Sequence, residues 1–198
     1  MEHQRNYTLE IIKLFASYMV VIIHFYFQDC VGIYLDALAR FAVPLFFIVS
    51  GFYSYQISLS KIKKRINNIV FLSLFSTLLY TAFRVARLIV ADNVAGISSY
   101  FGKYLNPNIL IRLFVFNIPL SSEHLWFLFS LIYVYVIFYL VTKYKISDGW
   151  ILGSSVLLLF AHIILGEFAL ANNIDHPAFV VRNFIFMGIP FFGLGLIA

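Results

Sequence analysis

The stretch YTLEIIKLFASYMVVIIHFYF, residues 7–27, is apolar and long enough to cross a lipid bilayer, which takes about 20 residues. It nevertheless contains three ionisable residues, Glu10, Lys13 and His24. Ionisable groups are costly inside hydrocarbon and by default indicate a functional path. Because 11 residues make three turns of an α-helix with only about 20° left over, Lys13 and His24 face the same side. Glu10 and Ser17 fall near the same line, so the helix is expected to present one polar stripe.

Two interpretations of this polar stripe are open. At a rise of about 1.5 Å per residue, Lys13 and His24 lie roughly 16 Å apart along the helix. A cation at one end and a titratable imidazole at the other suit a long anionic ligand whose reactive end reaches into the membrane. In the alternative, Lys13 snorkels to the interface and His24 bonds a neighbouring helix.

The composition of the whole chain is that of an integral membrane protein. Of its 198 residues, 62% are hydrophobic and only 12% are charged, whereas a soluble domain has about 25% charged residues. The net charge of +5 comes from basic residues between apolar runs, which the positive-inside rule explains better than a nucleic-acid partner does. The single cysteine, Cys30, excludes an internal disulfide, and no set of His, Asp or Cys has the spacing of metal ligands.

Six apolar runs predict an all-α, polytopic transmembrane bundle of about six spanning helices. They are expected at residues 7–27, 38–58, 67–91, 121–142, 149–170 and from 179 onward. Residues 61–65 and 92–107 are expected to be loops, and the short run 108–120 is expected to lie in the interface or to re-enter. Ser121 or Ser122 is the expected N-cap of the fourth span.

The basic residues also predict the orientation of the chain. Seven lie on one expected side, at Arg5, Lys61, Lys63, Lys64, Arg65, Lys143 and Lys145, against Lys103 and Arg112 on the other. The positive-inside rule therefore places the N-terminus in the cytoplasm. Residues 1–198 are expected to form a single integral membrane domain that is incomplete at its C-terminus, because they stop inside the sixth apolar run.

Four segments, in order along the chain, resemble the acyltransferase-3 family of bacterial membrane acyltransferases. They are NYTLEIIKLFASYMVVIIH (6–24), VPLFFIVSGF (43–52), HLWFL (124–128) and GIPFFGLG (188–195). The resemblance implies a bundle of about ten spanning helices in the bacterial inner membrane. It also implies an O-acetyltransferase, which moves an acyl group, typically acetyl, from cytoplasmic acetyl-CoA to a carbohydrate hydroxyl at or beyond the outer face. Its partners would be acyl-CoA, a carbohydrate acceptor such as a cell-surface glycan, and the bilayer, with no permanently bound cofactor.

The resemblance also implies roles for particular residues. The family's signature of Arg or Lys, ten residues and then His fits Lys13 and His24, which makes His24 catalytic and Lys13 a partner of the acyl donor. Glu10 matches the acidic residue three positions before that cation. The family's Arg-x-x-Arg pattern after the second helix implies a ligand-binding role for Arg65. The pattern is only half present, since Arg65 is followed by Asn68 in place of the second arginine. Three lysines nearby offer point charges but not the bidentate fork of arginine.

Acyl transfer to an alcohol needs a base for the hydroxyl proton and a stabiliser for the tetrahedral oxyanion. His24 is the candidate base because imidazole titrates near neutral pH. Direct transfer and a covalent acetyl-histidine intermediate are both open.

Further candidates each have a structural alternative. Ser50, beside Gly51 and after Pro44, is a candidate for close approach to a ligand, and helix packing through small residues is the alternative. His124 and Trp126 are a candidate platform for the acceptor sugar, or else an aromatic-belt anchor.

Two residues in the fifth span fit less well. His162 and Glu167 are five residues apart and are not expected to share a helical face closely.

A second class of function is compatible with the same features. A multi-pass transporter of a small polar or anionic solute would also have polar residues and proline-broken helices near the midplane. A non-catalytic membrane scaffold is a third possibility, but it gives no reason for the polar stripe.

Overall fold

The computed structural model describes residues 7–24, 30–91, 94–104, 107–119, 123–174 and 177–198, and within these ranges the fold is all-helical. Five segments are long and apolar enough to cross a membrane, which confirms the prediction of a polytopic helical bundle. They are α1 (Tyr7–His24), the pair α2 (Cys30–Ala39) and α3 (Ala42–Phe52), α4 (Leu59–Val90), α7 (Trp126–Lys143), and α8 (Asp148–Ile163) with its π-helical continuation η2 (Ile164–Phe168).

The sixth expected span is shorter than a membrane crossing and is broken. It consists of α10 (Ala178–Val181), the π-helical segment η3 (Phe184–Gly188) and α11 (Ile189–Ile197). The remaining elements are α5 (Val94–Tyr104), α6 (Pro107–Phe116), the 3₁₀ turn η1 (Glu123–Leu125) and α9 (Ala169–Ala171). The expected N-cap at Ser121 or Ser122 lies outside the described residues.

Two predicted loops are wrong. The basic residues 61–65 form the first turns of α4, and residues 94–104 of the second expected loop form α5. Lysine and arginine are good helix formers, so a run of positive charge does not by itself end a helix. With 32 residues, α4 is about 48 Å long, whereas the hydrocarbon core is about 30 Å thick. The helix is long enough to carry these charges beyond the hydrocarbon.

The second expected span begins earlier than predicted and is interrupted. Asp36, which precedes the expected span, lies in α2, and the helix breaks at Arg40 and Phe41 before α3 begins. Pro44 explains the break, because its nitrogen has no proton to donate to the Arg40 carbonyl and its ring collides with that carbonyl. Ser50 lies within α3, which continues to Phe52.

The centre of the fold is α11, which packs against α3 on one side and α8 on the other. Glycines allow this close approach. A Cβ atom on Gly51 of α3 would collide with the Phe192 carbonyl oxygen of α11, and one on Gly195 would collide with the Ile48 carbonyl oxygen. The α3–α11 contact is therefore packing of backbone against backbone through small residues. Gly51 takes part in it, as in the structural alternative given above for Ser50 and Gly51.

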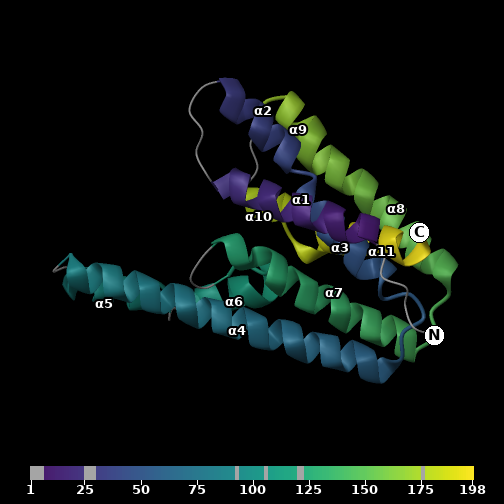
Figure 1. Cartoon of the computed structure of the whole chain (residues 1–198), viewed down its shortest axis with the longest axis horizontal. Coiled ribbons are helices and arrows are strands. Elements are labelled where there is room, and N and C mark those ends of the chain that lie inside the picture. Colours follow the sequence, from purple (N-terminus) through teal and green to yellow (C-terminus); the bar gives the residue numbers. More distant parts are fainter. Residues whose placement is uncertain (1–6, 25–29, 92–93, 105–106, 120–122, 175–176) are drawn as a thin grey trace.

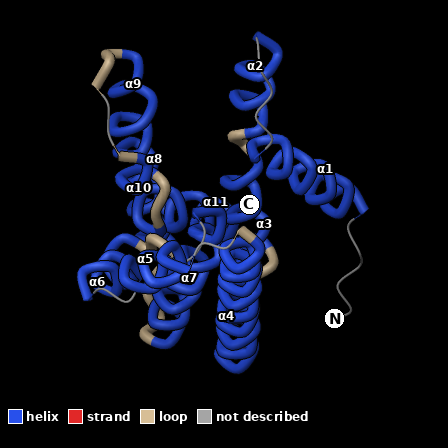
Figure 2. Tube along the Cα trace, turned by 90° about the vertical axis from the view of Figure 1, so that its left-hand side faces the viewer, coloured by secondary structure: helices blue, strands red, loops and turns tan. Residues whose placement is uncertain are grey.

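The remaining helices are arranged around this pair. Figure 1 shows α4 lying alongside α7, with which it packs. In Figure 2, α2 and the α8–α9 arm project in the same direction from the body of the molecule. The largest buried cluster joins α3, α4, α7 and α11, whereas α1 packs separately against α2 and α3 through Ala16 and Met19. Because α1 is outside the main core, one end of it borders a cavity.

Candidate active site

A cavity of about 770 Å³ lies beside the end of α1 that carries His24, a volume typical of small-molecule sites. Its walls come from α1, the α2–α3 break, η1 with the start of α7, the end of α8 with η2, and the segment around α10 and η3. The polar and ionisable residues in these walls are Ser17, Asp36, Arg40, His24, His124, His162, Glu167 and Arg182. Segments from both halves of the chain therefore line one cavity, whose walls combine these polar residues with apolar ones.

His24 and His124 meet in this cavity. Their ring centroids are 4.0 Å apart with the planes tilted by 59°. His24 is the last residue of α1, and His124 lies in the 3₁₀ turn that leads into α7. Trp126 lines the same cavity. The structure thus brings together the predicted catalytic histidine and the two residues predicted to bind the acceptor.

A buried asparagine fixes this wall. Asn117 adopts a left-handed backbone conformation with φ of 48°, which asparagine tolerates better than most residues. Its Nδ2 donates to the Trp126 carbonyl oxygen at 3.3 Å, and its Oδ1 accepts from the Phe184 backbone N–H at 3.1 Å. One side chain therefore ties the start of α7 to η3.

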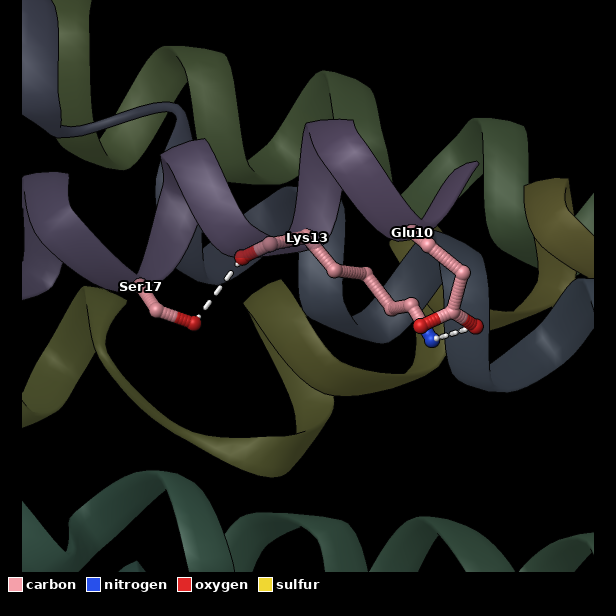
Figure 3. A network of polar contacts seen from close by, with 3 residues as sticks. All are labelled: Glu10, Lys13 and Ser17. Atoms are coloured by element: carbon pink, nitrogen blue, oxygen red, sulfur yellow. Dashed lines mark hydrogen bonds and ion pairs between the residues drawn. The ribbon is translucent and has the colours of Figure 1, made fainter. Parts of the chain in front are cut away.

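The polar stripe of α1 divides into two parts. Lys13 Nζ lies 2.7 Å from Glu10 Oε1 and 5.6 Å from the centre of the Tyr53 ring. Figure 3 shows this pair together with Ser17, whose hydroxyl donates to the Lys13 carbonyl oxygen at 2.9 Å. Ser17 and His24 line the cavity, whereas Lys13 and Glu10 do not. Their predicted roles with the donor stay predictions.

Arg65 and Ser50 lie away from this cavity, in a hydrogen-bond network at the end of α3. Arg65 Nη1 donates to Ser54 Oγ at 2.7 Å and to Tyr135 Oη at 3.2 Å, and its Nη2 donates to the Tyr53 carbonyl oxygen at 2.9 Å. The Ser50 carbonyl oxygen accepts from Ser54 Oγ at 2.6 Å. Arg65 therefore joins α3, α4 and α7, and its predicted ligand role is not tested by this geometry.

Three charged residues of the cavity were not among the residues predicted from the sequence: Arg182, Arg40 and Asp36. Arg182 follows α10, and its charge acts on His24 electrostatically. The next residue, Asn183, caps η3: its Oδ1 accepts from the backbone N–H groups of Ile185 and Phe186 at 2.8 and 2.9 Å. Asparagine is a preferred N-cap residue, so Asn183 indicated in the sequence that a helical segment starts directly after Arg182. Arg40 Nη2 lies 2.9 Å from Asp36 Oδ2. The two residues have the i, i+4 spacing of a helical ion pair, so the pair would have been predicted if residues 36–40 had been expected to be helical.

His162 and Glu167 were not expected to share a helical face closely, yet both line the cavity. That expectation assumed 3.6 residues per turn, but η2 is π-helical and its i→i+5 turn accommodates an additional residue. Residues five apart consequently reach the same side.

Among the described residues, no three His, Cys, Asp or Glu side chains form a group that could hold a metal ion.

Taken with the apolar helices, a comparison with known families defines the class: the chain is a multi-pass membrane acyltransferase. The acyltransferase-3 family model, described as an acyltransferase domain, matches residues 6–198, so the chain belongs to that family. No curated protein and no solved structure matches the chain significantly. The family match confirms the resemblance and favours the enzyme over the transporter.

Proposed function

We propose that the protein transfers an acetyl group from cytoplasmic acetyl-CoA to a hydroxyl of an extracytoplasmic carbohydrate or cell-surface glycan. In this proposal it lies in the bacterial inner membrane with its N-terminus in the cytoplasm. The observation that carries the proposal is the position of His24 within an acyltransferase domain. His24 lies in the wall of a cavity of about 770 Å³, and its ring centroid is 4.0 Å from that of His124. A base thereby stands in the wall of a cavity large enough for a small molecule.

In the proposed reaction, the acceptor hydroxyl gives its proton to the His24 imidazole as its oxygen attacks the thioester carbonyl carbon. The resulting oxyanion needs a positive or hydrogen-bonding neighbour, and Arg182 is the cation in the wall that acts on His24. The carbonyl then reforms, the C–S bond breaks, and the CoA thiolate takes the proton from His24. The products are an ester and free CoA. In the two-step variant, His24 is itself acetylated and passes the group on.

The donor would approach along α1. Lys13 lies about 16 Å before His24 along the helix, and Ser17, one turn after Lys13, already lines the cavity. In the proposal, Lys13 meets the CoA phosphates, Glu10 positions its ammonium group at 2.7 Å, and the pantetheine arm lies along Ser17. In the same proposal, His124 in η1 and Trp126 at the start of α7 bind the acceptor.

The test is acetyl transfer per unit of folded protein by His24→Ala and His24→Gln in the intact protein. A general base contributes about 10²–10⁴-fold in rate, so both variants should fall to background while still binding acetyl-CoA. Glutamine keeps a hydrogen-bonding group of similar reach but cannot take the proton. Protein label retained after rapid denaturation at neutral pH, with labelled acetyl-CoA and no acceptor, and absent in His24→Ala, would identify the two-step variant.

A structural histidine would give a different pattern. Alanine would then lower the amount of folded protein together with the activity, and glutamine would restore much of both. Activity of His24→Gln within a few fold of wild type would remove His24 from the mechanism.

A further inference from the structure

The π-helical segment η2 follows α8 at the point where this helix borders the cavity. A π-helical turn is less favourable than an α-helical one and is frequently retained at functional sites. Here its consequence is specific, since it brings His162 and Glu167 to one wall of the cavity that also contains His24. The proposed mechanism uses neither residue.

Packing does not account for His162. Its ring lies edge-on to Phe191, with centroids 5.9 Å apart and an interplanar angle of 84°. Its Nδ1 is buried and has no hydrogen-bond partner among the described residues. Most buried polar atoms are hydrogen-bonded, so this nitrogen is an exception.

Glu167 supplies the complementary chemistry. Its side chain is exposed at the cavity and interacts electrostatically with His162. Asp36, the other carboxylate in the walls, is engaged by Arg40 at 2.9 Å, whereas Glu167 forms no ion pair with a lysine or arginine in the described part of the chain. The two oxygens of an ionised carboxylate are acceptors, and two adjacent hydroxyls of a sugar are matching donors.

We propose that His162 and Glu167 bind the acceptor through a pair of adjacent hydroxyl groups, and so select a sugar that carries a free vicinal diol. This inference rests on the proposed acyl transfer to a carbohydrate. Glu167 accepts hydrogen bonds from the diol, and His162 forms a hydrogen bond with the same sugar beside it. The third hydroxyl, the one to be acylated, is left to His24. Both residues are acceptor-binding groups that take no part in the proton transfer.

The experiment uses the intact protein in nanodiscs with acetyl-CoA as donor. The acceptor probes are a panel of methyl hexopyranosides, their singly deoxygenated derivatives, and a de-O-acetylated bacterial surface polysaccharide. For Glu167→Gln, the KM for the acceptor should rise about 10–100-fold, the loss expected for hydrogen bonds to a charged group, and for His162→Leu about 2–10-fold, the loss expected for a neutral hydrogen bond. Their kcat, their acetyl-CoA affinity and their acceptor-independent hydrolysis of acetyl-CoA should stay within a few fold of wild type. Asp148→Asn, a carboxylate lost at the other end of α8, is the matched control and should leave the acceptor KM unchanged.

The deoxy sugars give the decisive comparison. Removing one hydroxyl of the recognised diol should weaken the acceptor for the wild type, but should cause little further loss in Glu167→Gln, because the partner is already absent. An unchanged acceptor KM in both variants, or an equal loss for every deoxy sugar in wild type and Glu167→Gln, would overturn this inference alone. No transfer by the wild type to any probe would overturn the proposed function and the inference with it. Because Glu167 is exposed, its variant tests the inference even where His162→Leu fails to fold.

Discussion

His24 and Lys13 share one face of α1 but have different surroundings. His24 lies in the cavity beside His124, whereas Lys13 is paired with Glu10 and lies over the Tyr53 ring. An ammonium group has three hydrogen-bond donors. The pair with Glu10 therefore leaves Lys13 able to meet a phosphate as well.

Replacement of Lys13 tests the proposed contact with the donor. Lys13→Ala should weaken binding of acetyl-CoA about 10–100-fold, because a hydrogen bond to a charged phosphate is lost, and Lys13→Arg should keep most of the affinity. The measurement is the dissociation constant of acetyl-CoA for each variant in detergent. Lys143→Ala removes an equal charge elsewhere and is the control. Unchanged affinity in Lys13→Ala would leave Lys13 as a snorkelling anchor.

Arg65 is expected to contribute mainly to stability. Its guanidinium donates to Ser54, Tyr135 and the Tyr53 carbonyl oxygen, and a lysine cannot reproduce this fork. Arg65→Ala and Arg65→Lys should both lower the thermal unfolding temperature, whereas Lys64→Ala, which removes the exposed neighbouring charge, should not. A normal unfolding temperature in Arg65→Ala, with weakened acetyl-CoA binding, would instead support the ligand role that the family resemblance implies.

At the scale of the helices, the close contact of α3 with α11 decides where the cavity walls stand. Gly51 and Gly195 place the two backbones against each other, and Gly188 lies against Val134 of α7. Because the obstructing atoms at Gly51 and Gly195 belong to the backbone, no side-chain rotation can make room. The α11 helix consequently holds η3, and with it Arg182, at a fixed distance from α3.

A methyl group at Gly195 should separate these helices. Gly195→Ala should destabilise the protein by about 1–3 kcal/mol, as overpacking usually does, and should lower acyl transfer as the cavity walls shift. Gly153→Ala is the matched control, since a Cβ atom there meets nothing within 4 Å and alanine favours the helix. Thermal unfolding in detergent compares the two. Equal stability of both variants would show that α3 and α11 do not depend on this contact.

At the scale of the whole molecule, the long helix α4 connects the two charged regions that set the orientation. Its first turns carry Lys61, Lys63, Lys64 and Arg65, and α5 with Lys103 follows its other end. The positive-inside rule predicts that the more basic end lies in the cytoplasm. The length of α4, about 48 Å, is sufficient to separate these regions by a bilayer.

Single cysteines test this orientation. Ser60→Cys at the start of α4 and Ser98→Cys in α5, each in a Cys30→Ser background, both replace exposed side chains. In intact cells, a membrane-impermeant thiol reagent should label Ser98→Cys, and should label Ser60→Cys only after the membrane is opened. Labelling of Ser60→Cys in intact cells would reverse the orientation and place His24 toward the cytoplasm.

The sequence by itself determined the local and compositional features. Its apolar runs predicted a helical membrane bundle, and four short segments, among them the one with Lys13 and His24, led to the family. Each of these signals depends only on residues close together in the chain. Helix boundaries near charges and proline were less predictable: the basic start of α4 is helical, and Pro44 breaks the second span upstream of itself. Propensity and charge compete there, and packing decides between them.

Only the tertiary structure decided which residues share the cavity. It joined His24 to His124 across 100 positions, separated Lys13 from the cavity, and added Arg182 from the last third of the chain. It also brought His162 and Glu167 to the same cavity through a π-helical turn, which a pattern based on 3.6 residues per turn cannot predict. A cavity is formed by segments that are distant in sequence, and their relative positions follow from helix packing such as that of Gly51 and Gly195, which no local pattern records.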